Sequence, residues 1–152
     1  MEKLESGILV LNDCYNANPA SMLAALITLR DLKNGHRAVA ILGDMLELGT
    51  QSDIAHETIG GKIPELDIDY LAVFGNQAQK IIAGACKAGM ANGDARGFDT
   101  KDELVRWLKQ LIKDGFIKAG DWLLVKGSRG MLMEEVLELL RKEQNYNLGR
   151  GD

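Results

Sequence analysis

The sequence predicts an α/β fold, namely a three-layer αβα Rossmann-like sandwich around a mostly parallel sheet. Length and composition are the first reason, because 152 residues with 46% hydrophobic and 26% charged side chains suit one packed core. The order of elements is the second, since short apolar runs alternate with amphipathic helical patterns about five times along the chain. Right-handed crossovers between such strands place helices on both faces of a parallel sheet.

The first strand and helix carry clear local signals. Residues 7–12 read GILVLN, an apolar β-branched run that is typical of a buried parallel strand. Asn18 is expected to cap a helix that begins with Pro19 at its first position. Apolar residues then recur at helical spacing until Asn34 and Gly35 end the helix.

The remaining elements continue the same alternation. In chain order we expect a strand at 37–42, a helix through His56 and Ile59, a connector at 64–69 and a strand at 70–74. A helix opened by Gly75 and an edge strand at 95–98 follow. The last elements are a helix capped by Thr100 with Glu103, a strand at 121–125 and a final helix that contains 133–140. The polar end 145–152 is expected to be a flexible tail. Residues 1–144 would then form a single domain.

Charge and hydropathy exclude several kinds of partner. A net charge of -4 without a long basic run gives no field for a phosphate backbone, so nucleic acid is not expected. No apolar run approaches the roughly 20 residues of a membrane span. The acidic start of the chain is unlike a signal peptide, which predicts a cytoplasmic location. Two cysteines and two histidines, widely spaced, predict no metal site.

Three polar loops follow predicted strands. The sequence DCYNANPAS (13–21) follows the first strand, GDMLELG (43–49) the second and KGSRG (126–130) the last. The carboxyl ends of parallel strands share one edge of the sheet, where ligands bind in such folds. We therefore expect these loops to line one crevice.

The residue types in these loops suit a ligand that carries both positive and negative groups. Asp13 can accept hydrogen bonds from sugar hydroxyls, while Asp44 or Glu47 suits an ammonium group or a general base. The run from Lys126 to Arg129 suits a carboxylate or phosphate at the start of a helix. Each loop also has a structural interpretation, because Asp and Gly are ordinary capping and turn residues and surface cations are usually solvated.

Two common nucleotide signatures are missing from the chain. The run Gly60-Gly61-Lys62 lacks both the upstream glycine and the following hydroxyl of a GxxxxGK[ST] phosphate loop. The first strand also turns into its helix without the glycines that a dinucleotide pyrophosphate needs. A stand-alone NTPase or NAD enzyme is therefore disfavoured.

The segments LNDCYNANPASM, ILGDMLELG with Ser52 and His56, FGNQA and VKGSRGMLMEEV together resemble the C-terminal domain of the Mur ligases of peptidoglycan synthesis. Within that family they are most similar to the member that adds D-alanyl-D-alanine to UDP-N-acetylmuramoyl-tripeptide. The resemblance implies an enzyme that uses ATP and magnesium to convert a carboxylate to an acyl phosphate, which the dipeptide amine attacks. The C-terminal domain of the family closes over a central ATPase domain.

The resemblance also implies roles for single residues. The implied ATP contacts are Asp13, at the ribose, with Tyr15, Asn16 and Asn18. The implied D-alanyl-D-alanine contacts are Asp44, Glu47, Lys126, Ser128 and Arg129. Of these, Lys126, Ser128 and Arg129 are also the implied catalytic residues, holding a carboxylate or a developing negative charge.

The chain lacks two sets of sites that the complete family members have. The family's phosphate loop and magnesium ligands lie in the central ATPase domain and its uridine site in the N-terminal domain, and neither pattern occurs here. We therefore expect the chain alone to be inactive and to bind no cofactor tightly. Two alternatives remain: a non-catalytic Rossmann-like module that binds a nucleotide or anion, and a sister Mur or folylpolyglutamate-type ligase domain.

Overall fold

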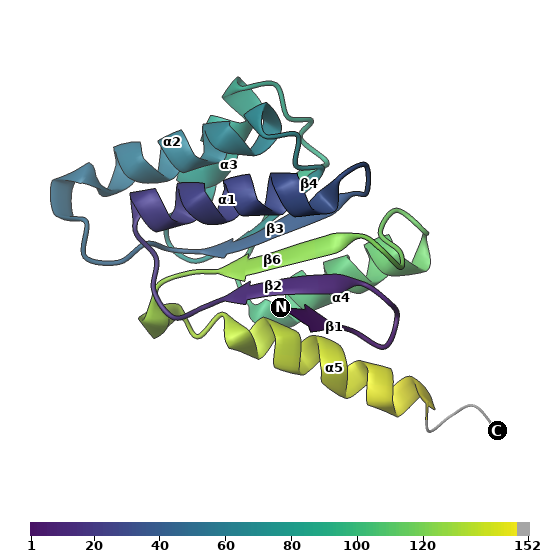
Figure 1. Cartoon of the computed structure of the whole chain (residues 1–152). Helices are drawn as coiled ribbons and strands as arrows, with labels where there is room; N and C mark the ends of the chain where they lie inside the picture. The colour runs from purple at the N-terminus through teal and green to yellow at the C-terminus, as the bar shows by residue number, and fades with distance from the viewer. Residues whose placement is uncertain (149–152) are drawn as a thin grey trace.

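The computed structural model describes residues 1–148, with side chains described as far as residue 142. At its centre lies a six-stranded sheet with the strand order β1-β2-β6-β3-β4-β5 (Figure 1). The strands are β1 (Glu2–Lys3), β2 (Leu9–Asp13), β3 (Ala38–Gly43), β4 (Tyr70–Phe74), β5 (Ala95–Phe98) and β6 (Trp122–Lys126). Every neighbouring pair is parallel except β1 with β2, so the predicted mostly parallel sheet is confirmed.

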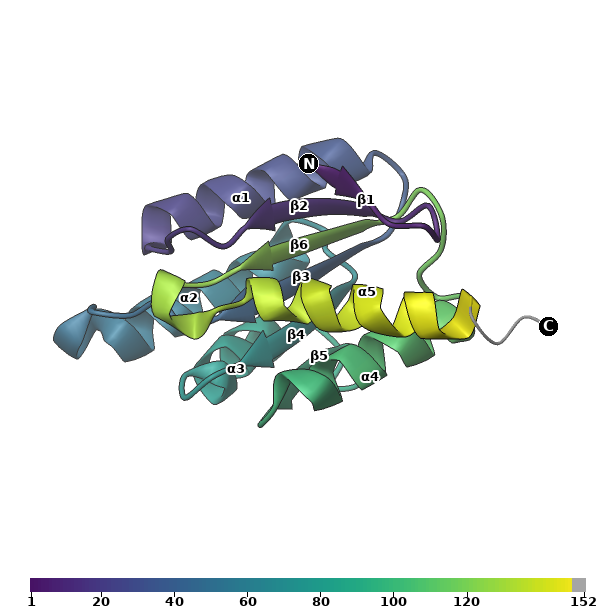
Figure 2. The same ribbon diagram turned by 90° about the horizontal axis from the view of Figure 1, so that it is seen from below.

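Helices cover both faces of this sheet. They are α1 (Pro19–Lys33), α2 (Ser52–Glu65), α3 (Ala78–Lys87), α4 (Lys101–Lys113) and α5 (Glu134–Leu148), with short 3-10 turns η1 (Gly49–Gln51) and η2 (Arg129–Met131). Helices α1, α2 and α3 lie on one face, and α4 and α5 lie on the other (Figures 1 and 2). The three-layer αβα sandwich expected from the sequence is confirmed.

Alternating strand residues divide the core into two layers. On β6, Leu124 packs with the α1–α3 side, whereas Leu123 and Val125 pack with the α4–α5 side. The central strand β3 is buried along its whole length, because successive side chains point to opposite covered faces. Both faces therefore need apolar residues, and the strands read as continuous apolar runs.

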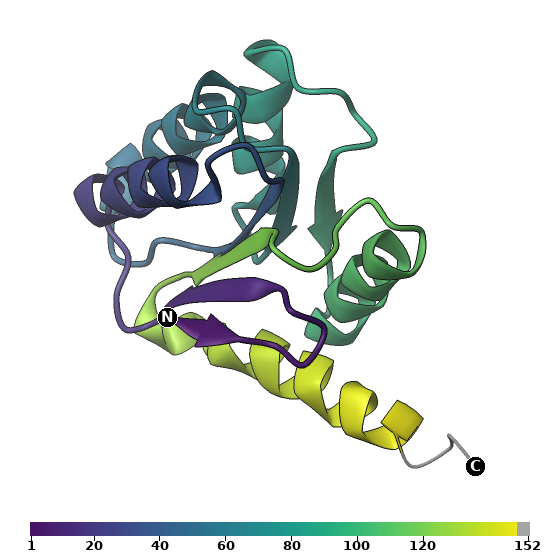
Figure 3. The ribbon, with the colours of Figure 1, turned by 45° about the vertical axis from the view of Figure 1, so that its right-hand side comes forward.

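The order of the strands places β6 between the two strands that precede the main loops. The chain passes from β2 through α1 to β3, continues outward to β4 and β5, and returns through α4 on the opposite face to insert β6 (Figure 3). Reversing the direction of travel while keeping right-handed crossovers puts the returning helix on the other face. The carboxyl ends of β2, β6 and β3 consequently lie side by side.

Most predicted elements match within a few residues, and the differences have local causes. Pro64 belongs to the last turn of α2 and not to a connector, because fully buried Ile63 continues the helical face to that point. Gly75 precedes α3 by three residues and takes a φ of +130°. Helix α5 continues to Leu148, past the predicted domain boundary at 144. The rest of the predicted tail lies outside the described residues.

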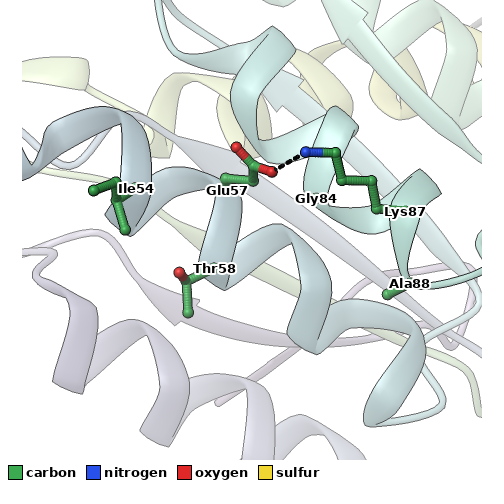
Figure 4. Close-up of a pocket in the computed structure, with 6 residues that line it drawn as sticks. All are labelled: Ile54, Glu57, Thr58, Gly84, Lys87 and Ala88. Carbon is green, nitrogen blue, oxygen red and sulfur yellow. Dashed lines mark hydrogen bonds and ion pairs between the residues drawn. The ribbon is translucent and has the colours of Figure 1, made fainter.

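Helices α2 and α3 pack closely because glycines face each other across the contact. A Cβ added at Gly60 would overlap the Ile81 carbonyl oxygen, and one added at Gly84 would overlap the Glu57 carbonyl oxygen. An exposed groove of about 500 Å³ runs along this helix pair, bridged by the Glu57–Lys87 ion pair (Figure 4). None of the residues that line this groove belongs to the predicted site, so the groove is separate from it.

Candidate functional site

The three predicted loops meet at the carboxyl edge of the sheet, held by Ser128. The Ser128 backbone N–H donates to the Asp44 carbonyl oxygen at 3.0 Å, and the Leu46 N–H donates to the Ser128 hydroxyl at 2.8 Å. The same hydroxyl lies 3.3 Å from the Ala17 carbonyl oxygen, to which it donates. Ser128 is 6% exposed and therefore ties the loops after β2, β3 and β6 together from within.

Lys126 makes a second connection between the loops. Its ammonium lies 2.7 Å from Asp13 Oδ2 and 2.9 Å from the Asn16 carbonyl oxygen. The side chain of Lys126 is only 1% exposed, whereas that of Asp13 is 43% exposed. The two residues are register partners on parallel strands, so their side chains leave the same face of the sheet. The buried Lys126 side chain thus supports the loop after β2, and the Asp13 carboxylate balances its charge.

Asp44 serves the neighbouring strand–helix loop. Its carboxylate accepts the Asn76 N–H at 2.9 Å and the Gln77 N–H at 3.0 Å, and the residue is 4% exposed. Gly75 must be glycine for this approach, because a Cβ there would overlap the Asp44 carboxylate. Asp44 therefore anchors the start of α3, and the geometry does not present its carboxylate to a ligand.

The loop from Asp44 to Leu48 leaves Glu47 exposed. Glu47 has a left-handed φ of +64°, a conformation that costs a residue with a Cβ about 1–2 kcal/mol. Just before it, the Met45 N–H donates to Nε2 of buried His56 at 2.9 Å. A side chain held outward in an unfavourable backbone conformation is a feature typical of functional loops.

The loop after β2 combines a cap with an exposed aromatic ring. Asn18 caps α1 as predicted: its side chain accepts the Ser21 N–H, and the Ser21 hydroxyl accepts the Asn18 N–H. The Asn16 side chain accepts the Ala17 N–H at 2.8 Å. Tyr15 is 84% exposed. The asparagines are thus partly used locally, while the Tyr15 ring is free to stack on a ligand.

A surface depression of about 450 Å³ lies beside this loop. The residues that line it are Asn12, Asp13, Cys14, Tyr15, Arg129 and Glu134. Arg129 Nη1 is 2.5 Å from Glu134 Oε1. The backbone N–H of Glu134 and the nearby guanidinium lower the pKa of the Glu134 carboxyl despite partial desolvation. Glu134 Oε2 is buried and has no hydrogen-bond partner among the described residues, so a donor from a ligand would satisfy it.

Cys14 lies at the floor of the depression but is not suited to nucleophilic chemistry. Its thiol donates to the Val125 carbonyl oxygen at 3.4 Å, and the residue is 8% exposed. Burial, and then the negative charges of Glu134 and Asp13, raise the pKa of Cys14 to about 11. At neutral pH the reactive thiolate is therefore almost absent.

The structure brings the predicted residues to one edge of the sheet but separates them into two groups. Asp13, Tyr15, Asn16, Asn18, Glu47 and Arg129 remain accessible, whereas Asp44, Lys126 and Ser128 are buried and hydrogen bonded within the protein. Sequence reasoning missed Glu134 and the structural role of His56. The signals for Glu134 were its place in the segment VKGSRGMLMEEV and in the first turn of the helix that follows Arg129.

The described part of the chain has neither a metal-ligand cluster nor a membrane-spanning helix. No group of three or more His, Cys, Asp or Glu side chains there is arranged to hold a metal ion. No helix there is both long and apolar enough to cross a membrane.

Comparisons with known proteins agree with the fold and the loop motifs. The family described as "Mur ligase, glutamate ligase domain" matches residues 1–129. The chain is 35% identical over 136 residues to the UDP-N-acetylmuramoyl-tripeptide–D-alanyl-D-alanine ligase of Bacillus subtilis, covering 90% of this chain and 28% of that protein. It is 36% identical over 140 residues to the ligase of the same name from Escherichia coli, covering 92% and 28%.

Solved structures give the same result. The MurF ligase from Thermotoga maritima in complex with ADP superposes with a TM-score of 0.77 at 27% identity, over 97% of this chain and 30% of that one. A MurF structure from Acinetobacter baumannii gives a TM-score of 0.74 at 31% identity, over 88% and 28%. The chain thus spans less than a third of the length of these relatives. Because the family match extends over most of its residues, the chain belongs to the Mur ligase family, as a glutamate ligase domain.

Proposed function

We propose that this chain is the part of an ATP-dependent ligase that completes the active site, and that the whole enzyme adds D-alanyl-D-alanine to UDP-N-acetylmuramoyl-tripeptide in the cytoplasm. The observation that carries the proposal is the open depression at the carboxyl edge of the sheet, where Asp13, Arg129 and Glu134 gather beside the exposed Tyr15 ring. The names of the aligned relatives support the choice of reaction.

The nucleotide side of this half-site is proposed to centre on Asp13. Lys126 uses only Oδ2 of Asp13, so Oδ1 keeps acceptor capacity for a ribose hydroxyl. The unpartnered Oε2 of Glu134 offers a second acceptor in the same depression. Tyr15 supplies an aromatic face, and Asn16 and Asn18 lie on the same loop. These residues suit the sugar of ATP better than its phosphates, because the charged acceptors repel anions.

The amine side is proposed to use the accessible residues of the other two loops. Glu47 would attract the ammonium of D-alanyl-D-alanine or accept its proton, and Arg129 would hold a carboxylate. Lys126 and Ser128, expected from the family resemblance to contact substrate, are proposed to act through the loops that they join. Asp44 has its two hydrogen bonds to α3 and is given no substrate contact.

The chemistry that ATP supplies is activation of the tripeptide carboxylate as an acyl phosphate. The residues of this chain would bind the ribose, orient the amine and limit water at the reacting carbon. The family resemblance assigns the magnesium ligands to the central ATPase domain, and the described residues of this chain contain no group of three or more His, Cys, Asp or Glu side chains that could hold a metal ion.

Three exposed large apolar side chains support the view that another domain covers this edge. Tyr15 and Leu46 belong to the loops after β2 and β3, and Leu132 directly follows η2; all three are at least 43% exposed. Apolar side chains that gather beside a polar depression are typical of an interface that closes over substrate.

The test is to measure phosphate release by the full-length protein that contains this domain, with ATP, magnesium and the UDP-linked tripeptide. D-alanyl-D-alanine should stimulate release strongly, whereas D-glutamate and diaminopimelate should not. Stimulation by one of those amines instead would favour a sister ligase. Nucleotide binding without any amine-dependent turnover would favour the non-catalytic module.

A further inference from the structure

His56 is completely buried, and both of its ring nitrogens bond to the backbone. Its Nε2 accepts the Met45 N–H at 2.9 Å, so Nε2 carries no proton. The proton of the neutral ring is then on Nδ1, which lies 2.6 Å from the Ser52 carbonyl oxygen and donates to it. The Ser52 hydroxyl lies 3.3 Å from the same nitrogen. The surroundings therefore define a single tautomer.

This histidine connects helix α2 to the loop that carries Glu47. Three consecutive residues of that loop are each held by a different element. Asp44 binds the start of α3, Met45 binds His56, and Leu46 binds Ser128. Glu47 comes next, exposed and with its left-handed φ of +64°. Without the Met45 contact, the loop would keep its anchors at Asp44 and Leu46 but lose the one between them.

We infer that His56 is a positioning residue for the amine side of the site: as a neutral imidazole protonated at Nδ1, it fixes the loop from Asp44 to Leu48 and so the placement of Glu47. It does not touch substrate, because it is fully buried behind the loop. The assignment of a substrate role to Glu47 rests on the proposed function, but the structural part of the inference does not.

Two substitutions separate the two hydrogen bonds. In His56→Gln, the side-chain amide reaches about as far as Nε2 and can still accept the Met45 N–H. In His56→Asn, the shorter amide reaches only as far as Nδ1, so the bond to Ser52 survives and the bond to Met45 is lost. Both replacements are polar and smaller than imidazole, which makes them a matched pair.

The first measurement uses the 152-residue chain by NMR. The ring nitrogens of His56 should give the neutral pattern with the proton on Nδ1, distinct from the more exposed His36. Amide exchange of Met45 and Leu46 should accelerate about tenfold in His56→Asn, the effect of losing one ordinary hydrogen bond. It should change less than about threefold in His56→Gln. Exchange at Ile41, in the core of β3, reports global stability and should be similar in both variants.

The inference is overturned if the His56 ring carries its proton on Nε2, or if Met45 and Ile41 accelerate in parallel in both variants. If His56→Asn does not fold, the tautomer and the exchange pattern of His56→Gln still decide. In the full-length ligase, His56→Asn should raise KM for D-alanyl-D-alanine about tenfold with KM for ATP unchanged, and His56→Gln should restore it. An enzyme that does not use this dipeptide would refute the proposed function and leave the NMR result standing.

Discussion

The Lys126 ammonium lies 2.7 Å from Asp13 Oδ2, although 113 residues separate them in sequence. One partner is buried and the other is half exposed, so the pair joins the interior of the sheet to the rim of the proposed site. Lys126, at the start of the loop after β6, thus supports the position of Asp13, the acid proposed to bind ribose. Asp13 therefore has two roles, since its removal would leave a buried cation without a counter-charge.

Lys126→Met should lower the free energy of unfolding by about 1–2 kcal/mol, because the Asn16 carbonyl loses its donor and water only partly replaces the lost contact at the half-exposed Asp13 carboxylate. Lys80→Met makes the same chemical change in an exposed pair whose atoms are 4.0 Å apart, and should cost less than about 0.5 kcal/mol. Urea unfolding of both variants measures the difference. Equal costs would mean that the Lys126 pair contributes no more than a surface pair.

Gly60→Ala should destabilise the protein by about 2 kcal/mol or more, because the new Cβ would overlap the Ile81 carbonyl oxygen and push α2 away from α3. Gly61→Ala is the matched control on the same helix, since the nearest atom to its Cβ would be 3.7 Å away. That variant should be neutral or more stable by up to about 1 kcal/mol from helix propensity. Thermal unfolding of both proteins distinguishes the two, and similar melting temperatures would contradict the packing of these helices.

Gly75→Ala should be more harmful than Gly89→Ala, although both glycines have a positive φ, of +130° and +107°. At Gly89 the Cβ would meet nothing within 4 Å, so only the backbone cost of about 1 kcal/mol applies. At Gly75 the Cβ would also displace the Asp44 carboxylate from the start of α3. Chemical denaturation should give the larger loss for Gly75→Ala, together with altered Asn76 and Gln77 amide shifts. Unchanged shifts would argue against the Asp44 anchor.

Cys14 should react with a thiol reagent much more slowly than Cys86 in the folded protein, and equally fast in denaturant. Burial raises the pKa of Cys14 from 9.0 to about 11, whereas Cys86 is only partly buried. The unfolded thiol ionises first, so its contribution to stability is complete below pH 9 and declines as the pH rises from about 9 to about 11. Cys14→Ser should reduce that alkaline loss. Rapid modification of Cys14 at neutral pH would show that the floor of the depression opens.

Arg129→Gln should leave stability within about 0.5 kcal/mol, because its ion pair with Glu134 is exposed on the arginine side. In the full-length ligase the same change should raise KM for D-alanyl-D-alanine about tenfold, since the charge-assisted contact proposed between Arg129 and its carboxylate is lost. Arg30→Gln removes another exposed ion pair, with Asp31 on α1, and should affect neither quantity. If the two variants have the same kinetics, Arg129 is not a substrate contact.

Local sequence determined the elements and their order. The cap at Asn18 with Pro19, the cap at Thr100 and the apolar strand runs each act over a few residues, so a linear reading finds them. Parallel pairing then follows from the alternation of strand and helix, and with it the expectation that the three loops share an edge. The antiparallel β1 escaped notice because two residues give no periodicity.

Only the tertiary structure decided which polar residues stay accessible and which hold the protein together. Asp44, Lys126 and Ser128 have the composition of a binding site, yet their partners come from strands and loops 32 to 113 residues away. Glu47 and Arg129 stay exposed because nothing in the described chain covers them, whereas Glu134 is partly buried. The burial and the hydrogen-bond partners of a residue depend on which distant segments contact it. Local spacing in the sequence does not predict those contacts. Residue chemistry therefore located the polar edge of the sheet, and packing decided which of its polar residues are buried supports and which remain accessible.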